Sequence, residues 1–401
     1  MQSLCIRCKG KGLCGKPCKI LSRFIDSAPK VKKHFSGSTP PEIFVGRTGY
    51  PHVFSGIISP NEKGETQEYS MPEEWVSGNL SIEQILSHRG KMIYARQEKI
   101  NIKLPQLMNV KMQEIALSSR PVSVEFFLKR QPSFDFTPSK VFSILTNAAP
   151  LEKINLEENV KVDRKVDNLV SDYDAPAQKA LIELYQSNIS NSHLSKLLSA
   201  GLLGIKMQRK LVPTRWAITA VDDMLSKNLI QKIKYYPEIN EFLLFHDEYN
   251  GNHYEIIFMP GNFSFEVIEA EVPGNIWNPS QKIEFMQDYE NFFNRKEYAS
   301  NVTGAYYANR LAICEYLEKI QRQAAILVLR EVKEEYYAPL GVGILRELVR
   351  RALKKDPENP GDIEEAFKII QTRVKIPATE FRKVSKLLKD YGKQKKLNKW
   401  F

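Results

Sequence analysis

The chain has 401 residues, more than one ordinary hydrophobic core accommodates, so we expect two or three domains. Hydrophobic residues make up 42% and charged residues 26% of the sequence, and no apolar run approaches the ~20 residues that cross a bilayer. The composition excludes a membrane-spanning protein, and the lack of a secretory signal pattern predicts a cytoplasmic one.

The net charge of +11 is concentrated at the two ends of the chain. Residues 1–35 carry a net charge of +8 and residues 382–401 a net charge of +7, which leaves −4 for the residues between them. Short basic ends on a mildly acidic body are typical of proteins that bind a polyanion such as nucleic acid. Solvated basic termini without a partner are the alternative.

Four of the five cysteines lie close together near the N-terminus. They are spaced Cys-x2-Cys-x5-Cys-x3-Cys and are Cys5, Cys8, Cys14 and Cys18. Four thiolates at these spacings can close a tetrahedron around a structural Zn²⁺, and they leave no open position for catalysis. An iron–sulfur cluster and a metal-free segment are the alternatives, although the bacterial ferredoxin run is tighter and has a proline after its last cysteine.

Basic residues alternate with these cysteines. They offset the charge of a four-thiolate centre and could contact the phosphates of DNA, and they are Arg7, Lys9, Lys11, Lys16 and Lys19. Further along, Arg47 lies within Gly46-x-x-Gly49, where a backbone could approach a phosphate closely. A structural β-turn is the alternative for that segment.

The body of the chain predicts alternating helices and strands. In chain order these are helical spacing at 80–99, a strand at 122–128, helical spacing at 137–147, a polar connection at 148–172 and two helices within 175–204. Asn250-Gly251 stands between two apolar runs and is the favoured type I′ turn of a hairpin, and residues 263–272 predict a third strand. The pattern then becomes helical, with a long helix at 303–335, a capping box at Asp362 and a basic helix at 378–390.

A helix that begins after Pro213 would carry an arginine and two adjacent aspartates. On it Arg215 and Asp222 lie two turns apart, and Asp223 follows directly. These side chains could hold a nucleotide or Mg²⁺, and the alternative is a helix with an ordinary salt bridge. Because no nucleophile stands in a recognisable motif, the sequence leaves open whether the protein is an enzyme.

The last eight residues resemble the PIP box, the peptide by which DNA-processing proteins bind the PCNA-type sliding clamp. The matching positions are Gln394, Leu397, Trp400 and Phe401. One helical turn places Leu397 and Trp400 on the same side, where aromatic anchors fill a groove of the partner. Trp400 stands where this motif more often has Phe or Tyr. A terminal helix that packs these aromatics into its own core is the alternative.

Taken together, the chain resembles the Nre family of archaeal DNA-repair proteins over nearly its whole length. The resemblance rests on the cysteine cluster, on residues 45–51, 212–216 and 337–343, and on the terminal peptide. It implies a larger N-terminal domain with the finger, a smaller helical C-terminal domain, and a role in DNA-damage repair with recruitment by the sliding clamp. It implies no catalytic residue.

We therefore predict an α+β protein with four parts: a zinc-binding finger at 1–20, a mixed domain at 21–280, a mainly helical domain at 281–393 and a clamp-binding peptide at 394–401. The predicted function is a DNA-binding repair factor that is recruited by the clamp and associates with the archaeal nucleoid, not with a membrane. The alternatives are a DNA- or nucleotide-processing enzyme with its site around residues 215–223, and an RNA- or ribosome-associated zinc-finger protein.

Overall fold

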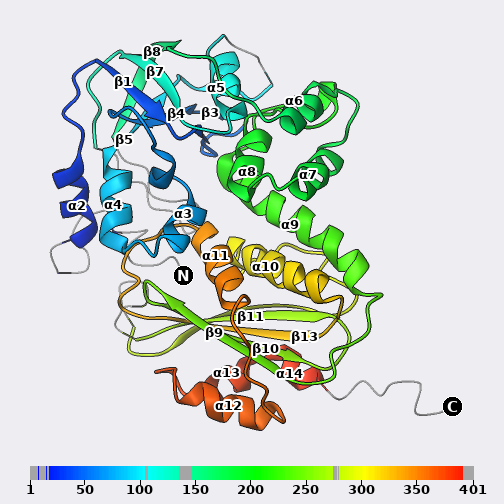
Figure 1. Cartoon of the computed structure of the whole chain (residues 1–401). Helices are drawn as coiled ribbons and strands as arrows, with labels where there is room; N and C mark the ends of the chain where they lie inside the picture. The colour runs from blue at the N-terminus through cyan, green and yellow to red at the C-terminus, as the bar shows by residue number, and fades with distance from the viewer. Residues whose placement is uncertain are drawn as a thin grey trace.

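Two β-sheets and the helices around them form the molecule, in agreement with the predicted α+β class (Figure 1). The computed structural model describes residues 8, 15, 18–103, 107–134, 147–273, 278 and 280–391. A two-stranded ribbon of β3 (His52–Val53) and β6 (Ile100–Asn101) stands beside the first sheet. Among the described helices, none is both long and apolar enough to cross a bilayer.

The first sheet has six strands in the order β1-β7-β8-β5-β4-β2. Their bounds are β1 (His34–Thr39), β2 (Glu42–Val45), β4 (Ser55–Pro60), β5 (Met92–Arg96), β7 (Val122–Leu128) and β8 (Ala148–Leu156). β5 and β8 run parallel, and the other neighbours in the sheet run antiparallel. Buried and half-buried residues alternate along β7, as a strand with one face on the core requires.

The first sheet curls until β1 meets β4, although three strands separate them in the sheet order. The Ser38 backbone N–H donates to the carbonyl of Glu62 at 2.8 Å, and the Thr39 hydroxyl donates to the carbonyl of Ile58 at 2.8 Å. At Gly37 the two backbones are so close that an added Cβ would lie 1.9 Å from the Pro60 carbonyl oxygen. Glycine therefore permits this closure.

Helices of the first half surround the first sheet and lead to the second. They are α2 (Lys19–Ser27), α3 (Pro72–Ser77), α4 (Ile82–Lys91), α5 (Leu107–Leu117), α6 (Arg164–Ser171), α7 (Ala177–Gln186), α8 (Asn191–Ser199) and α9 (Thr214–Ile233), with 3₁₀ turns at Gln67–Tyr69 and Lys206–Gln208. The two helices predicted within 175–204 are thus confirmed as α7 and α8. The long helix α9 runs from the first sheet towards the second and lies alongside the later helix α10 (Gly304–Ile320) (Figure 1).

The second sheet has five strands in the order β12-β11-β13-β10-β9. Their bounds are β9 (Leu243–Tyr249), β10 (Asn252–Met259), β11 (Ser264–Glu271), β12 (Glu284–Glu290) and β13 (Ala325–Val332). The predicted hairpin is confirmed as β9 and β10, with Asn250 and Gly251 at φ 48° and 74°, as a type I′ turn requires. The predicted third strand is confirmed as β11, but β13 lies between it and β10.

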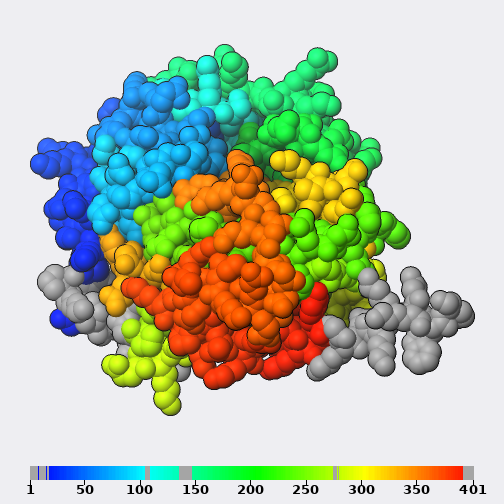
Figure 2. All heavy atoms as spheres, turned by 60° about the horizontal axis from the view of Figure 1, so that its bottom comes forward, coloured from blue at the N-terminus to red at the C-terminus, as the bar shows by residue number. Residues whose placement is uncertain are grey.

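Helices cover both faces of the second sheet, which makes three layers. One face packs against α9, α10 and α11 (Gly343–Ala352), in a core that continues to the first sheet. The other face packs against α12 (Ile363–Gln371), α13 (Ala378–Val384) and α14 (Lys386–Asp390), which Figure 2 shows from below. The Asp362 cap of α12 is confirmed by its bond from the Glu365 N–H at 2.8 Å.

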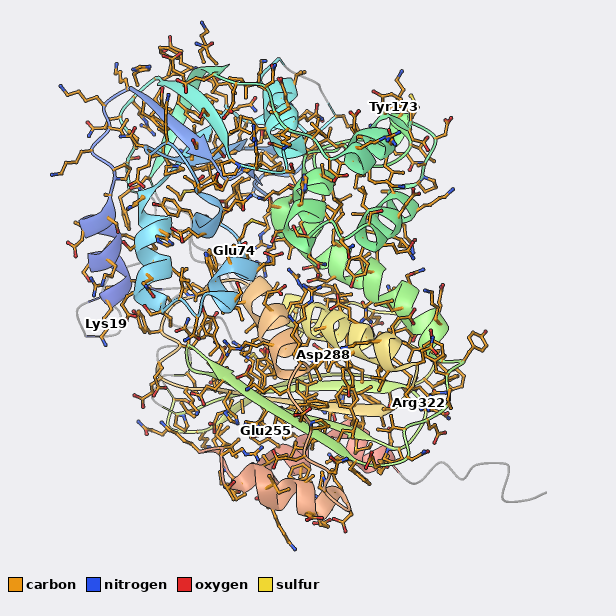
Figure 3. All side chains as sticks on the ribbon, in the orientation of Figure 1. Lys19, Glu74, Tyr173, Glu255, Asp288 and Arg322 are labelled. Carbon is orange, nitrogen blue, oxygen red and sulfur yellow. The ribbon has the colours of Figure 1, made fainter. Side chains whose placement is uncertain are left out.

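The second sheet also buries charged groups, two of which are labelled in Figure 3. Glu255 on β10 accepts a hydrogen bond from His253 at 2.9 Å. Asp288 on β12 accepts the backbone N–H of Val302 at 2.7 Å, in the segment that leads into α10. Each buried carboxylate therefore has a partner, as its burial requires.

The prediction of a mainly helical C-terminal domain is wrong. Residues after 280 supply β12 and β13, and β13 is the central strand of a sheet that also contains β9, β10 and β11. The long helix predicted at 303–335 divides into α10 and β13, because the aliphatic run in β13 is buried on both faces and has no period-two alternation. The helical pattern at 80–99 likewise divides into α4 and β5, and the connection predicted at 148–172 contains β8 and α6. Most of the helix predicted at 137–147 lies outside the described residues.

Candidate nucleic-acid interface and adjoining cavity

Three segments that are far apart in the sequence meet between the first sheet and α11. They are residues 45–51, 212–216 and 337–343, the same internal segments on which the family resemblance rests. The backbone N–H of Val45 donates to the hydroxyl of Thr214 at 2.9 Å, and the ring centroids of Tyr50 and Trp216 are 5.1 Å apart. Thr214 also lines a cavity together with Leu340. The three segments therefore form one structural junction.

A basic and aromatic surface lies on the outside of this junction. We call it the arginine–tryptophan surface, and it consists of Arg47, Tyr50, Arg215, Trp216 and Tyr298. Its aromatic side chains are unusually open to solvent, with exposed fractions of 42% for Tyr50, 44% for Trp216 and 53% for Tyr298. Trp216 is therefore not a core residue, and it offers part of its ring to a ligand.

The two arginines of this surface lie near one another without a matching negative charge. Burial, followed by the positive charge of Arg47, lowers the pKa of Arg215. In the described part of the chain neither arginine forms an ion pair, whereas Arg310 and Arg346 pair with carboxylates. Two neighbouring guanidinium groups remain charged and repel each other, so an anion placed between them is stabilised.

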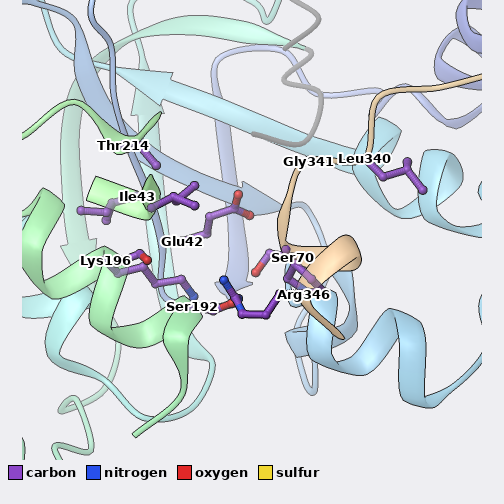
Figure 4. A pocket seen from close by; sticks show the side chains of 13 residues that line it. Glu42, Ile43, Ser70, Ser192, Lys196, Thr214, Leu340, Gly341 and Arg346 are labelled. Carbon is purple, nitrogen blue, oxygen red and sulfur yellow. The ribbon is translucent and has the colours of Figure 1, made fainter. Parts of the chain in front are cut away.

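A cavity of about 70 Å³ lies at the same junction, between α3, α8, α9 and α11 (Figure 4). The polar side chains in its wall include Ser70, Ser192, Ser195, Lys196, Thr214 and Arg346. Figure 4 shows Lys196 and Arg346 reaching into it from opposite sides, the first from α8 and the second from α11. The cavity thus has hydroxyl groups, two cationic groups and the carboxylate of Glu42 in its wall.

Among the described residues Lys196 forms no ion pair, whereas the neighbouring Arg89 and Arg346 each pair with a carboxylate. Its amine donates to the carbonyl of Pro40 at 3.0 Å, and burial lowers the pKa of this amine, although Glu42 and Glu73 oppose the change. Both carboxylates have closer partners. Glu42 pairs with Arg89 at 2.7 Å, and Glu73 accepts the N–H and hydroxyl of Ser192, the latter at 2.8 and 2.9 Å.

The predicted group of Arg215, Asp222 and Asp223 does lie on one helix, α9, but its members face different neighbours. Asp222 is buried and accepts two bonds from Arg346, at 2.8 and 3.0 Å, while Asp223 pairs with Arg310. Each aspartate thus connects α9 to another helix. Among the residues that the structure describes, no cluster of three or more acidic, histidine or cysteine side chains could hold a metal ion.

The predicted finger and clamp peptide lie largely outside the described residues. This applies to Cys5, Arg7, Lys9, Lys11, Cys14, Lys16, Gln394, Leu397, Trp400 and Phe401. Cys8 is buried, and the sulfur of Cys18 accepts the Leu21 N–H at 3.4 Å at the start of α2. Lys19 begins α2 (Figure 3), and its amine lies 5.7 Å from the ring centroid of Tyr337, so α2 reaches the third segment of the junction. Zinc and clamp binding therefore stay predictions.

Several residues of the junction are not indicated by any pattern in the sequence. Lys196, Ser195 and Arg346 belong to amphipathic helices, where polar residues ordinarily face solvent. The available signal was that Lys196 stands between Leu194 and Leu197, on a helix whose leucines are buried. Such a pattern alone does not distinguish a lysine in a cavity from one at the edge of an apolar face.

Comparison with known proteins agrees with the resemblance. The family model described as Archaeal Nre, N-terminal, matches residues 13–278, and the one described as Archaeal Nre, C-terminal, matches residues 290–400. The chain is 34% identical over 393 residues to DNA repair protein NreB of Archaeoglobus fulgidus, with 98% of each chain covered. It is 37% identical over 381 residues to DNA repair protein NreA of the same organism, covering 92% of this chain and 93% of the relative.

A third relative, DNA repair protein NreA of Haloferax volcanii, is 31% identical over 363 residues, covering 87% of this chain and 85% of the relative. No solved structure matches the chain. Its two parts match the N-terminal and C-terminal models of archaeal Nre proteins, and the chain therefore belongs to the Nre family. The family-like segments noted in the sequence thus have a shared location in the fold, at the junction described above.

Proposed function

We propose that this protein is a DNA repair factor that binds DNA and is recruited to damaged or replicating DNA, at the nucleoid, by a PCNA-type sliding clamp. Relatives that are similar over almost their whole length are named DNA repair proteins, which supports the repair role. The cysteine cluster is proposed to hold a structural zinc ion. The bond from Leu21 N–H to the Cys18 sulfur fits a thiolate ligand, because metal-bound thiolates accept such bonds.

The observation that carries DNA binding is the arginine–tryptophan surface. Arg47 and Arg215 offer guanidinium groups without ion-pair partners among the described residues, and these groups can contact phosphate oxygens. Trp216 and Tyr50 are half exposed beside them, and their rings can stack on unpaired bases. The basic N-terminal segment would add further phosphate contacts with little sequence specificity.

The double variant Arg47→Ala, Arg215→Ala is expected to bind single-stranded DNA at least about tenfold more weakly than the unchanged protein. Because two phosphate contacts are removed, the slope of log affinity against log salt should decrease by about 2. Fluorescence anisotropy over a salt series measures both quantities. Arg164→Ala, which removes an exposed arginine from α6, is the matched control and should leave them unchanged. A double variant with the affinity and slope of the unchanged protein would place DNA binding elsewhere.

Removal of the terminal peptide is expected to abolish clamp binding and to leave DNA binding intact, because the two activities use different parts of the chain. The measurement is a calorimetric titration of the sliding clamp from the same cell with the full chain and with a chain that ends at Lys393. Trp400→Ala, Phe401→Ala removes only the two aromatic anchors and should have the same effect. If the shortened chain still binds the clamp, the tail is not the docking peptide. The same DNA assay with structured RNA tests the RNA-binding alternative.

A further inference from the structure

We propose that the cavity between α8, α9 and α11 binds a phosphomonoester group, either of a free mononucleotide or at the end of a DNA strand. The DNA-end form of this inference rests on the proposed function, whereas the free-ligand form does not. The cavity lies at the junction of the three family-like segments, and its helix ends, its side chains and its size favour an anion.

Helix N-termini converge on the cavity. Ser192 is the second residue of α8, and Thr214 and Gly343 are the first residues of α9 and α11. The first turn of a helix has backbone N–H groups without intrahelical acceptors and carries partial positive charge. α8 is capped by Ser190 and Glu73, but within the described residues α9 and α11 have no side-chain cap. Two helix ends therefore remain available to an anion.

Side chains in the wall add hydroxyl groups that can donate to an anion. Ser195 is only 7% exposed and lines the cavity. The buried hydroxyl oxygen of Ser70 has no hydrogen-bond partner within the described part of the chain. A buried hydroxyl without a partner is destabilising, so Ser70 would gain from a bound oxygen ligand, and Ser195 offers a second hydroxyl to the same ligand.

Lys196 supplies the charge for such a ligand. Its amine bonds to a carbonyl, and the carboxylates of Glu42, Glu73 and Asp222 are bound to other groups. Arg346 approaches from the opposite wall, where it is held by Asp222. Burial disfavours the charged form of Lys196, and an anion in the cavity would restore it.

The size of the cavity limits the ligand. At about 70 Å³ it can hold a phosphate group and a few waters, but it is much smaller than the several hundred Å³ of a site that encloses a whole nucleoside. Thr214 lines the cavity, and the next two residues of α9, Arg215 and Trp216, belong to the arginine–tryptophan surface. A strand bound on that surface could therefore place a terminal phosphate in the cavity.

The test uses the full chain with three probes: inorganic phosphate, a 5′-mononucleotide, and single-stranded oligonucleotides with and without a 5′-phosphate. Calorimetry should show saturable binding of phosphate or mononucleotide. Lys196→Met and Ser195→Ala should each weaken it at least about tenfold, since each removes a donor to a charged oxygen. Lys179→Met, on an exposed part of α7, is the matched control. Ser195→Ala gives a second test in case Lys196→Met does not fold. An unfolding transition measured without phosphate shows whether each variant is folded.

The DNA probes separate the two sources. Tighter binding of the 5′-phosphorylated strand, with the preference lost in Lys196→Met, assigns the cavity to DNA ends. Phosphate binding without that preference supports the free-ligand form. The Arg47→Ala, Arg215→Ala variant should bind both oligonucleotides more weakly, by the same factor. If the unchanged protein binds phosphate but no DNA, the proposed function fails and this inference stands. If the unchanged protein binds no phosphomonoester in any form, the inference is wrong.

Discussion

Arg310→Met is expected to lower the free energy of unfolding by about 3–5 kcal/mol, because it leaves a buried carboxylate without its partner. Arg310 is 1% exposed and lies within 3.1–3.2 Å of the carboxylate of Glu290 on β12. It also bonds to Asp223 and Ser226 on α9 and lies over the rings of two tyrosines of α10. One side chain thus holds α9, α10 and the second sheet together. Urea unfolding followed by circular dichroism measures the change.

Lys227→Met is the matched control for this measurement. Lys227 pairs with the same carboxylate, Asp223, at 2.7 Å, but its side chain is 48% exposed. Exposed pairs are screened by water, so the expected loss is about 0–1 kcal/mol. If both variants lose the same small amount of unfolding free energy, the buried ion pairs of Arg310 contribute little to stability. The helices and the sheet are then held mainly by their apolar contacts.

Gly37→Ala is expected to destabilise the protein by about 3 kcal/mol or more, because the new methyl group would overlap a backbone oxygen. The added Cβ would lie 1.9 Å from the Pro60 carbonyl, and a backbone atom cannot move aside as the end of a side chain can. β1 and β4 would have to separate, which breaks the closure of the first sheet. The midpoint of urea unfolding, compared with that of the unchanged protein, gives the effect.

Gly361→Ala is the control for the glycine substitution. Its nearest neighbour would be the end of the flexible Glu365 side chain at 3.2 Å, and the position is exposed. The change in stability should therefore stay within about 0.5 kcal/mol. A Gly37→Ala protein as stable as this control would mean that β1 and β4 do not meet as closely as described.

Local signals predicted those parts of the fold that depend on neighbouring residues. The Asn250-Gly251 turn and the Asp362 cap were correct because each is decided within a few residues of the chain. β13 was missed because its pairing with β10 and β11 is decided by residues more than 50 positions away. A short aliphatic run suits a buried helix and a buried strand equally well, and only its partners resolve the choice.

Individual residues of the candidate site could be predicted from the sequence, but their arrangement in space could not. The sequence indicates Arg47 and Arg215 separately, but only the fold shows that their segments are neighbours, through the Val45–Thr214 hydrogen bond and the Tyr50–Trp216 ring contact. The aspartates of α9 were noted as possible ligands, yet Asp222 pairs with Arg346, 124 positions away. No local pattern indicates a partner at that distance, so the sequence could not distinguish a binding group from a structural ion pair.

The position of β13 between β10 and β11 has a consequence for synthesis on the ribosome. β10 and β11 emerge one after the other, but the space between them stays empty until residue 332 has left the exit tunnel. During that interval each of the two strands exposes one edge of unpaired backbone groups, the condition under which nascent chains associate with one another. The second sheet therefore cannot close before β13 is available, and its two halves stay open at their inner edges until then.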